Sequence, residues 1–320
     1  ELESGQGGGR WAQWNAFRRY VSRTRPQVVV SFLSYFSVLT AVHAAATGAR
    51  VVFNQQTPMT AFLSDGDYPW RRGWRRGVFN AATTLGYAAA DRIITTSQGV
   101  ADDLVDAFSV RRGSISVIPN PVDLDAVRAA AAEDIPPEHA AKWAKPVIVA
   151  AGRLAEAKNY PLLIDAMKLL RERVDARLFI LGTGEQEASI RARIAERGLE
   201  DAVILCGFQK NPWKYIARAD LFALSSHYEG FGNVLIEAMA NGVPVVATAS
   251  AGTRDIVRHN VDGLLVETHG AVTFADALAT VLSNHATRQR MSEEARRGAE
   301  RFALPKVSQV YDDTFAGVFA

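Results

Sequence analysis

The sequence is poor in cysteine and has no long apolar run. Its one cysteine, Cys206, lies in an apolar stretch and cannot form an internal disulfide, which favours a reducing compartment. No apolar segment reaches the roughly 18 residues that a membrane-spanning helix requires, and the first residues carry no signal-peptide pattern. We therefore expect a cytoplasmic chain that neither spans a membrane nor is exported.

Neither sign of charge dominates. The 36 lysines and arginines against 34 aspartates and glutamates give a formal net charge of +2, which is too small to indicate a nucleic-acid partner. A G-x-G-x-x-G motif with an acid about twenty residues further on is also missing, which disfavours a Rossmann dehydrogenase. With 48% hydrophobic and 22% charged residues, the 320-residue chain is typical of a globular protein of two domains.

Short β-rich runs alternate with longer helical patterns. This alternation predicts βα units on parallel sheets and therefore an α/β fold. The ten strand candidates are residues 27–33, 49–54, 91–97, 114–120, 147–152, 177–182, 202–208, 219–226, 244–250 and 263–267. The first four and the last six predict two doubly wound halves.

We expect these halves to join near VIPNPVD, residues 117–123, and in the segment of residues 130–146, whose prolines and mixed charge are typical of a linker. We therefore expect an N-terminal domain over residues 1–140 and a C-terminal domain over 141–302. The helical pattern of residues 303–320 is expected to return to the N-terminal domain. The chain opens on a polar glycine stretch where a doubly wound half has a strand, so we expect the N-terminal domain to be incomplete at its start.

The stretch EGFGNVLIEAMANG places two glutamates eight positions apart around a glycine loop. Gly230 and Gly232 allow a strand to turn into the helix of residues 233–242, whose first amides and positive dipole end favour phosphate. Glu237, on the first turns of that helix, is suited to ribose hydroxyls, and Glu229, in the loop, to sugar hydroxyls. The alternative interpretation is a solvated loop acid and a helix-surface acid.

Two further loops follow strands at the same sheet edge. AAGRLAEAKNYP offers Arg153 and Lys158, cations suited to a diphosphate. LGTGEQE offers Gly182 and Gly184, where a ligand can approach the backbone. Each signal alone is weak, but the three loops together predict a phosphate-binding edge of one parallel sheet.

Over most of residues 90–302 the sequence resembles the retaining glycosyltransferases of family 4. The resemblance is carried by AADRIITTSQGVADDL, VIPNPVD, AAGRLAEAKNYPLLIDAM, ILGTGEQE, VILCGF and EGFGNVLIEAMANGVPVVAT. The glutamate pair around GFGN is the most specific of these motifs. The resemblance implies the GT-B fold, in which two Rossmann-like domains face each other across a cleft, and sugar transfer with retention of configuration.

The resemblance also implies a role for each motif residue. Arg153 and Lys158 hold the donor diphosphate and assist its departure, Glu229 contacts the donor sugar, and Glu237 contacts the ribose. Further donor-binding positions are Gly152, Gly182, Gly184, Phe208, Gly230, Phe231, Gly232, Asn233 and Val234. The donor is a UDP- or GDP-sugar and the acceptor a glycan or glycolipid, with no cofactor and no essential metal.

One position departs from the family pattern. Many members carry a histidine directly after the strand that corresponds to residues 49–54, where it lies near the reacting sugar, but here Asn54, Gln55 and Gln56 follow. Asn54 or Gln55 can donate a hydrogen bond to a sugar hydroxyl but cannot act as a base. His43, on the preceding alanine-rich helix, is expected to be a packed histidine.

Residues 67–80, DYPWRRGWRRGVFN, predict a short basic and aromatic helix. Apolar residues gather on one side and arginines on the other: Trp70, Trp74 and Val78 against Arg71, Arg72, Arg75 and Arg76. Such a helix suits an anionic membrane surface on the cytoplasmic side. The alternative is a surface helix whose tryptophans pack inward.

Two other functions share the predicted donor site. One is a sugar-nucleotide 2-epimerase of GT-B type, and the other is a sugar-nucleotide binding module without catalysis. Incubation with a nucleotide sugar alone distinguishes the epimerase, and binding without turnover distinguishes the module.

Overall fold

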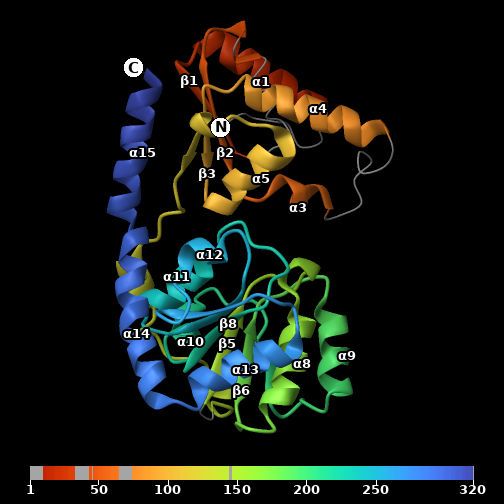
Figure 1. The fold of residues 1–320 in the computed structure, drawn as a ribbon, viewed down its shortest axis with the longest axis vertical. Helices are drawn as coiled ribbons and strands as arrows, with labels where there is room; N and C mark the ends of the chain where they lie inside the picture. Colours follow the sequence, from red (N-terminus) through yellow and green to blue (C-terminus); the bar gives the residue numbers. More distant parts are fainter. Residues whose placement is uncertain (1–9, 33–42, 45, 65–73, 144–145, 320) are drawn as a thin grey trace. The chain divides into compact units, whose positions relative to one another are not determined.

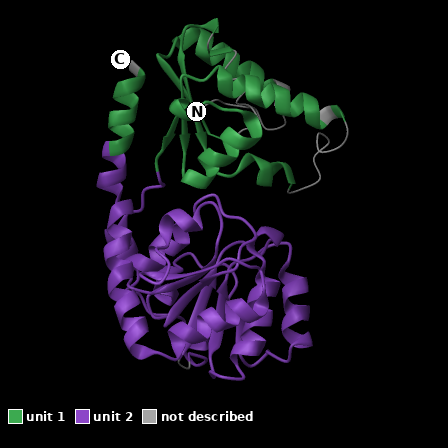
Figure 2. Cartoon of the chain, in the orientation of Figure 1, with its two compact units in different colours: residues 1–118, 310–320 green, residues 119–309 purple. Residues whose placement is uncertain are grey.

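The computed structural model describes residues 10–32, 43–44, 46–64, 74–143 and 146–319. Two compact units are present (Figure 2): unit 1 comprises residues 1–118 and 310–320, and unit 2 comprises residues 119–309. The division falls after Ile118, within the VIPNPVD stretch where the halves were expected to join and upstream of the boundary given after residue 140.

Unit 1 contains a four-stranded parallel sheet with the order β1-β2-β3-β4 (Figure 1). Its strands are β1 (Val28–Phe32), β2 (Arg50–Gln55), β3 (Arg92–Thr95) and β4 (Ile115–Val117). Its helical segments are α1 (Arg10–Thr24), α3 (Met59–Ser64), α4 (Trp74–Ala88), α5 (Gln98–Phe108) and η2 (Arg112–Ser114). Buried apolar side chains of β2, β3 and α5 form the core, with Phe53, Ile93 and Leu104 at most 2% exposed.

Unit 2 contains a six-stranded parallel sheet with the order β10-β9-β8-β5-β6-β7. Its strands are β5 (Val147–Ala151), β6 (Arg177–Leu181), β7 (Val203–Leu205), β8 (Leu221–Leu224), β9 (Val245–Thr248) and β10 (Gly263–Val266). The strand order changes direction between β5 and β8, which is the arrangement of a doubly wound fold.

The helices of unit 2 follow the strands in alternation. They are α6 (Leu124–Ala130), α7 (Pro137–Ala140), η3 (Glu156–Lys158), α8 (Tyr160–Leu170), α9 (Glu187–Glu196), α10 (Trp213–Ile216), α11 (Asn233–Ala240), α12 (Thr253–Ile256), α13 (Ala271–Leu282), α14 (His285–Ala299) and η4 (Glu300–Phe302). The last helix, α15 (Leu304–Phe319), begins in unit 2 and ends in unit 1.

Both faces of the unit 2 sheet are buried. Along β5, Ile148 packs in one apolar cluster with Leu163 of α8, while Val149 packs in a second cluster with Ile236 of α11. Helices on both faces explain why these strands are continuous apolar runs without polar alternation. All ten predicted strands are present, so the α/β class is confirmed.

The prediction that residues 130–146 form a linker is wrong for the described part of that segment. It contains α7, and His139 Nδ1 lies 2.7 Å from the hydroxyl of Tyr215. Trp143 packs against Phe179, with ring centroids 4.5 Å apart. The two aromatic rings, together with Ile135, bury apolar area against the unit 2 core, and this burial attaches the segment to unit 2.

Candidate functional site

Loops after β5, β6 and β8 meet at the carboxyl edge of the unit 2 sheet. Backbone hydrogen bonds connect them: Gly152 N donates to Leu181 O at 3.0 Å, and His227 N donates to Ala157 O at 2.8 Å. The edge between β5 and β8 is the topological switch point, where ligands of open parallel sheets bind. The predicted motif residues therefore lie where this fold presents a site.

Lys158 and Glu229 form an ion pair across the switch point. Lys158, at the end of η3 after β5, lies with Nζ 2.6 Å from Glu229 Oε2 in the loop after β8. Their side chains are only 24% and 17% exposed, so solvent screens the pair weakly. The hydroxyl of Ser226 donates a second hydrogen bond to the same carboxylate oxygen at 3.2 Å. A cation and a carboxylate are thus held together beside the start of α11.

The buried side chain of Tyr160 packs behind the loop that carries Lys158. The Tyr160 side chain is 3% exposed, and its hydroxyl donates to Gly152 O at 3.2 Å. Burial, and then the charge of Glu229, raise the pKa of the Tyr160 hydroxyl well above its usual value, so it remains a donor. The Ser225 hydroxyl also donates to Lys158 O at 2.9 Å. These two bonds hold the backbone of the loop after β5 at Gly152 and at Lys158.

Arg153 is held much more loosely than Lys158. Its side chain is 72% exposed, and Nη2 lies 3.2 Å from Glu185 Oε1 in the loop after β6. An exposed pair of this kind contributes little stability, about 0–1 kcal/mol. The guanidinium is therefore available to an anion at the edge.

Close packing between two loops requires the glycines after β6. A Cβ on Gly182 would lie 1.9 Å from Gly152 O, and a Cβ on Gly184 would lie 2.4 Å from Leu154 O. Gly182 also has φ of 144°, which disfavours other residues. These glycines serve the loop contact, and Gly182 in addition lines a pocket.

That pocket, of about 390 Å³, opens beside β5 and β6. Its lining comes from residues 151–153, 181–183, 208, 209 and 212. Phe208, from the loop after β7, is 75% exposed on the pocket wall. Four predicted donor-binding residues, Gly152, Arg153, Gly182 and Phe208, are therefore brought together around one cavity.

Glu237 lies on α11 behind the edge. Its Oε2 accepts a hydrogen bond from Trp213 Nε1 at 2.8 Å, next to the pocket residue Pro212. Burial raises the pKa of the Glu237 carboxyl, and the bond from Trp213 opposes that rise. One carboxylate oxygen is thus oriented by Trp213.

The turn into α11 has a positive φ at Gly232, as predicted, but not at Gly230. Gly232 adopts φ of 100° at the N-cap, and the amides of Asn233 and Val234 belong to the first turn, whose N–H groups have no partner within the helix. Asn120 Nδ2 donates to Asn233 Oδ1 at 3.2 Å. The ring of Phe231 points into the core and contacts Phe302, with centroids 5.6 Å apart.

Comparison with known families decides what kind of protein this is. Residues 132–298 match the family "Glycosyl transferases group 1", and residues 4–126 match "Glycosyltransferase Family 4". The first match alone covers more than half of the chain. The chain belongs to the group 1, family 4 glycosyltransferases.

Characterised members of the family are similar over much of the chain. The chain is 35% identical over 227 residues to N-acetylgalactosamine-N,N'-diacetylbacillosaminyl-diphospho-undecaprenol 4-alpha-N-acetylgalactosaminyltransferase of Campylobacter jejuni, covering 71% of this chain and 60% of the relative. It is 31% identical over 291 residues to D-inositol 3-phosphate glycosyltransferase of Xylanimonas cellulosilytica, covering 86% of this chain and 66% of the relative. The chain therefore spans about two thirds of the length of these relatives or less.

The fold of the family is also found among solved structures. Anabaena Alr3699/HepE in complex with UDP superimposes with a TM-score of 0.81 at 20% identity, over 95% of this chain and 82% of that chain. Together with the two parallel-sheet units, this likeness confirms the predicted GT-B fold.

In unit 1 of this glycosyltransferase family member, the last two residues of β2 form hydrogen bonds within the unit. Asn54 is 3% exposed, and its Nδ2 donates to the hydroxyl of Tyr311 at 3.3 Å. Gln55 accepts from the hydroxyl of Tyr87 at 2.9 Å. His43 packs edge-on against Trp14 with centroids 6.0 Å apart, which is the packed histidine that was predicted.

Part of the predicted basic helix over residues 67–80 lies outside the described residues, namely 67–73. The described part begins α4, and its Trp74 and Val78 are 76% and 57% exposed, so these two side chains do not pack inward. Throughout the part of the chain that the structure describes, every helix is too short or insufficiently apolar to cross a bilayer.

The described residues do not form a metal site of clustered His, Cys, Asp or Glu side chains, because no three of these side chains gather to hold a metal ion. Of two Asp-x-Asp triplets, the one at Asp123 and Asp125 begins a helix, because Asp123 Oδ1 accepts from Ala126 N at 2.9 Å. The other, Asp65 and Asp67, lies outside the described residues.

Sequence reasoning missed several residues that build the site. They are Tyr160, Trp213, Ser226 and Gly252. A Cβ on Gly252 would lie 2.3 Å from Phe231 Cα, and Gly252 N donates to Glu229 O at 2.9 Å. Of these residues, only Gly252 could have been proposed from the sequence, because it lies in the loop after the apolar strand β9, just as Gly182 lies in the loop after β6.

Proposed function

We propose that this chain transfers a sugar from a nucleoside-diphosphate sugar to a glycan or glycolipid hydroxyl, with retention of configuration. The observation that carries the proposal is the pairing of Lys158 with Glu229 at the switch point, with Arg153 on the same edge. Two cations suit a diphosphate, and a carboxylate suits the sugar next to it. We propose a UDP- or GDP-sugar as the donor, since each carries a diphosphate bonded to a sugar.

Departure of the diphosphate is the step that these charges assist. When the anomeric bond breaks, the sugar becomes oxocarbenium-like and the leaving phosphate gains negative charge. Lys158, Arg153 and the positive end of α11 then interact more strongly with the transition state than with the bound donor. Arg153 is exposed and free to close on the phosphate, whereas Lys158 is held in place by Glu229.

The nucleoside part of the donor suits the 390 Å³ pocket. Phe208 offers a ring on which a base can stack, because every base has a π-face. Glu237, oriented by Trp213, offers its other carboxylate oxygen to ribose hydroxyls. Transfer by these groups needs no divalent metal, and activity should persist in a chelator.

The acceptor proposal takes its support from the relatives. The Campylobacter relative is named for a diphospho-undecaprenol-linked saccharide and the Xylanimonas relative for D-inositol 3-phosphate. We assign this chain to a lipid-linked or cell-envelope glycan acceptor reached from the cytoplasmic membrane face.

Exposed Trp74 and Val78 on α4 support contact with an anionic membrane surface through residues 67–80. Flotation with anionic liposomes tests this contact, and flotation that persists in a Trp74→Ser/Val78→Ser variant would contradict it.

Product analysis tests the transferase directly. Wild type and an Arg153→Ala/Lys158→Ala variant are incubated with UDP- and GDP-sugars and a lipid-linked saccharide acceptor. We expect a glycosylated product with the donor's anomeric configuration, seen by NMR, and a loss of at least about 100-fold in rate for the variant. Full activity in the variant overturns the assignment. An altered nucleotide sugar formed without acceptor identifies an epimerase, and binding without turnover identifies a binding module.

A further inference from the structure

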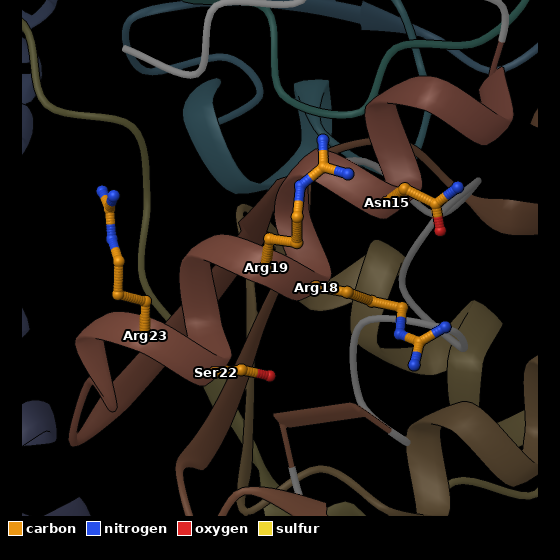
Figure 3. Close-up of a pocket in the computed structure, with 5 residues that line it drawn as sticks. All are labelled: Asn15, Arg18, Arg19, Ser22 and Arg23. Carbon is orange, nitrogen blue, oxygen red and sulfur yellow. The ribbon is translucent and has the colours of Figure 1, made fainter.

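One face of α1 lines a pocket that the donor site does not use. Asn15, Arg18, Arg19, Ser22 and Arg23 line a shallow cavity of about 540 Å³ that is open to solvent along one face of α1 in unit 1 (Figure 3). Their spacing of three and four residues places them on one side of a helix. Three arginines, one amide and one hydroxyl therefore face this cavity from two turns of one helix.

The sequence around α1 concentrates positive charge. Between residues 4 and 64 there is no aspartate or glutamate and no lysine, while arginine occurs at 10, 18, 19, 23, 25 and 50. A chain with a net charge of only +2 thus has a segment in which all formal charge is of one sign. Local potential, and not net charge, governs attraction of an anion to such a surface.

Two other arginines of unit 1 have acidic partners, unlike the arginines of the cavity. Arg50 pairs with Asp91 at 2.8 Å, and Arg112 pairs with Asp102 at 2.7 Å. In contrast, Arg18, Arg19 and Arg23 are exposed and form no ion pair with any residue that the structure describes. Their mutual repulsion is uncompensated within the described chain, and an anion would relieve it.

The opposite face of α1 fixes the position of these arginines. Val21 is 1% exposed, and Trp14 stacks on Phe17 with centroids 5.6 Å apart. His43 contacts both rings, at 6.0 and 6.2 Å. Because the apolar face is anchored in the unit, the polar face has a defined location and is not merely one side of a loose helix.

Figure 3 shows how the guanidinium groups are arranged. Arg19 and Arg23 extend to the same side of α1, whereas Arg18 turns toward the side of Asn15. The groups spread along the helix and do not converge on one point. Such a row suits an anion with more than one phosphoryl group, since each guanidinium can bind a phosphate in a bidentate manner.

We propose that the polar face of α1 is a second anion site, which binds diphosphate groups or closely spaced phosphate esters. Arg18, Arg19 and Arg23 supply the charge, and Asn15 and Ser22 supply neutral hydrogen bonds. The site uses residues of unit 1 and none of the donor-edge residues of unit 2, and its existence does not depend on transferase activity.

Calorimetry with inorganic pyrophosphate tests the site in the full chain. To silence the donor edge, the titration uses an Arg153→Ala/Lys158→Ala background. We expect Arg18→Gln/Arg19→Gln/Arg23→Gln in that background to weaken pyrophosphate binding at least about tenfold and to flatten its salt dependence. A matched control, Arg191→Gln/Arg290→Gln/Arg297→Gln, removes the same charge from helices of unit 2 and should change the affinity less than about twofold.

The results of these titrations test the proposal and distinguish the two sources of phosphate. Equal losses in both triple variants, or none in the α1 variant, overturn the proposal. If the α1 variant also loses sedimentation with phosphatidylglycerol vesicles, lipid headgroups are the source of the phosphate; if only pyrophosphate binding falls, the source is a free or substrate-borne diphosphate. Circular dichroism confirms that each variant is folded, and UDP binding to the wild-type chain, measured separately, reports on the proposed function.

Discussion

Lys158 Nζ lies 2.6 Å from Glu229 Oε2, although 71 positions separate these residues in the chain. The pair joins the loop after β5 to the loop after β8 and closes the switch point of the unit 2 sheet. Its members were predicted to contact two adjacent groups of the donor, Lys158 the diphosphate and Glu229 the sugar. The ion pair therefore preorganises the edge before any ligand binds, and each partner limits the mobility of the other.

The first prediction concerns the stability of this pair. Lys158→Ala leaves the Glu229 carboxylate, 17% exposed, without its cation, and we expect the free energy of unfolding to fall by about 1–3 kcal/mol. In a Glu229→Gln background the same substitution should cost about 1 kcal/mol less, because no charge remains unpaired. Urea unfolding of the four proteins of this cycle measures the coupling. Arg153→Ala, at a 72% exposed side chain, is the control and should cost less than about 0.5 kcal/mol. Strict additivity in the cycle would show that the pair contributes nothing.

The second prediction concerns pH and Glu237. Burial raises the pKa of this carboxyl in the folded chain, so its contribution to stability is fully present below the unfolded pKa and is lost as pH rises through the folded pKa. Glu237→Gln keeps an acceptor for Trp213 but carries no charge. We therefore expect the variant to equal wild type below about pH 4 and to exceed it increasingly at higher pH, by about 1.4 kcal/mol for each unit that separates the two pKa values.

Urea unfolding across a pH series measures this difference. Glu200→Gln makes the same chemical change at an exposed position and should leave the pH profile of stability close to that of wild type. The Glu237→Gln variant should also bind UDP more weakly than wild type, since a carboxylate accepts ribose hydrogen bonds better than an amide. A Glu237→Gln protein that is less stable than wild type at neutral pH would contradict the burial argument.

The third prediction concerns the contact between the loops after β5 and β6. Gly182→Ala places a Cβ 1.9 Å from Gly152 O at a φ of 144°, and we expect a loss of about 3 kcal/mol or more from overpacking and backbone strain together. Gly198→Ala separates these causes, because Gly198 has φ of 62° but open space around it, so strain alone should cost about 1 kcal/mol. Gly113→Ala, with open space and no positive φ, should change stability by less than about 0.5 kcal/mol. Equal losses at Gly182 and Gly198 would show that the loop contact is not tightly packed.

Much of this architecture could be predicted from local sequence, and its limits have a physical origin. The strands were predicted because parallel strands buried on both faces are continuous apolar runs, as in β5 and β8. The edge loops were predicted because Gly182 and Gly232 mark turns after such runs. The bond between Trp213 and Glu237 was not predictable, because it depends on where α10 packs against α11. The segment around Trp143 was misassigned because its prolines and charges outweighed its two aromatic side chains, His139 and Trp143.

The last prediction concerns Phe208 and separates binding from folding. Its ring is 75% exposed on the wall of the pocket after β7, so Phe208→Ala removes little buried area and should change the free energy of unfolding by less than about 0.5 kcal/mol. Stacking of a base on an aromatic ring contributes about 1–3 kcal/mol, which corresponds to a loss of about 5- to 150-fold in UDP affinity. Isothermal titration calorimetry with UDP measures this loss, and Phe208→Trp should retain most of the affinity because it keeps an aromatic face.

Phe179 is the matched control for the same substitution. It is 0% exposed and packs against Trp143, so Phe179→Ala should destabilise unit 2 by about 3–5 kcal/mol while the affinity of the remaining folded protein for UDP changes little. The two phenylalanines thus predict opposite patterns, one in binding and one in stability. If Phe208→Ala binds UDP as tightly as wild type, the base does not occupy this pocket, and the nucleotide must be bound along the edge through Lys158 and α11 instead.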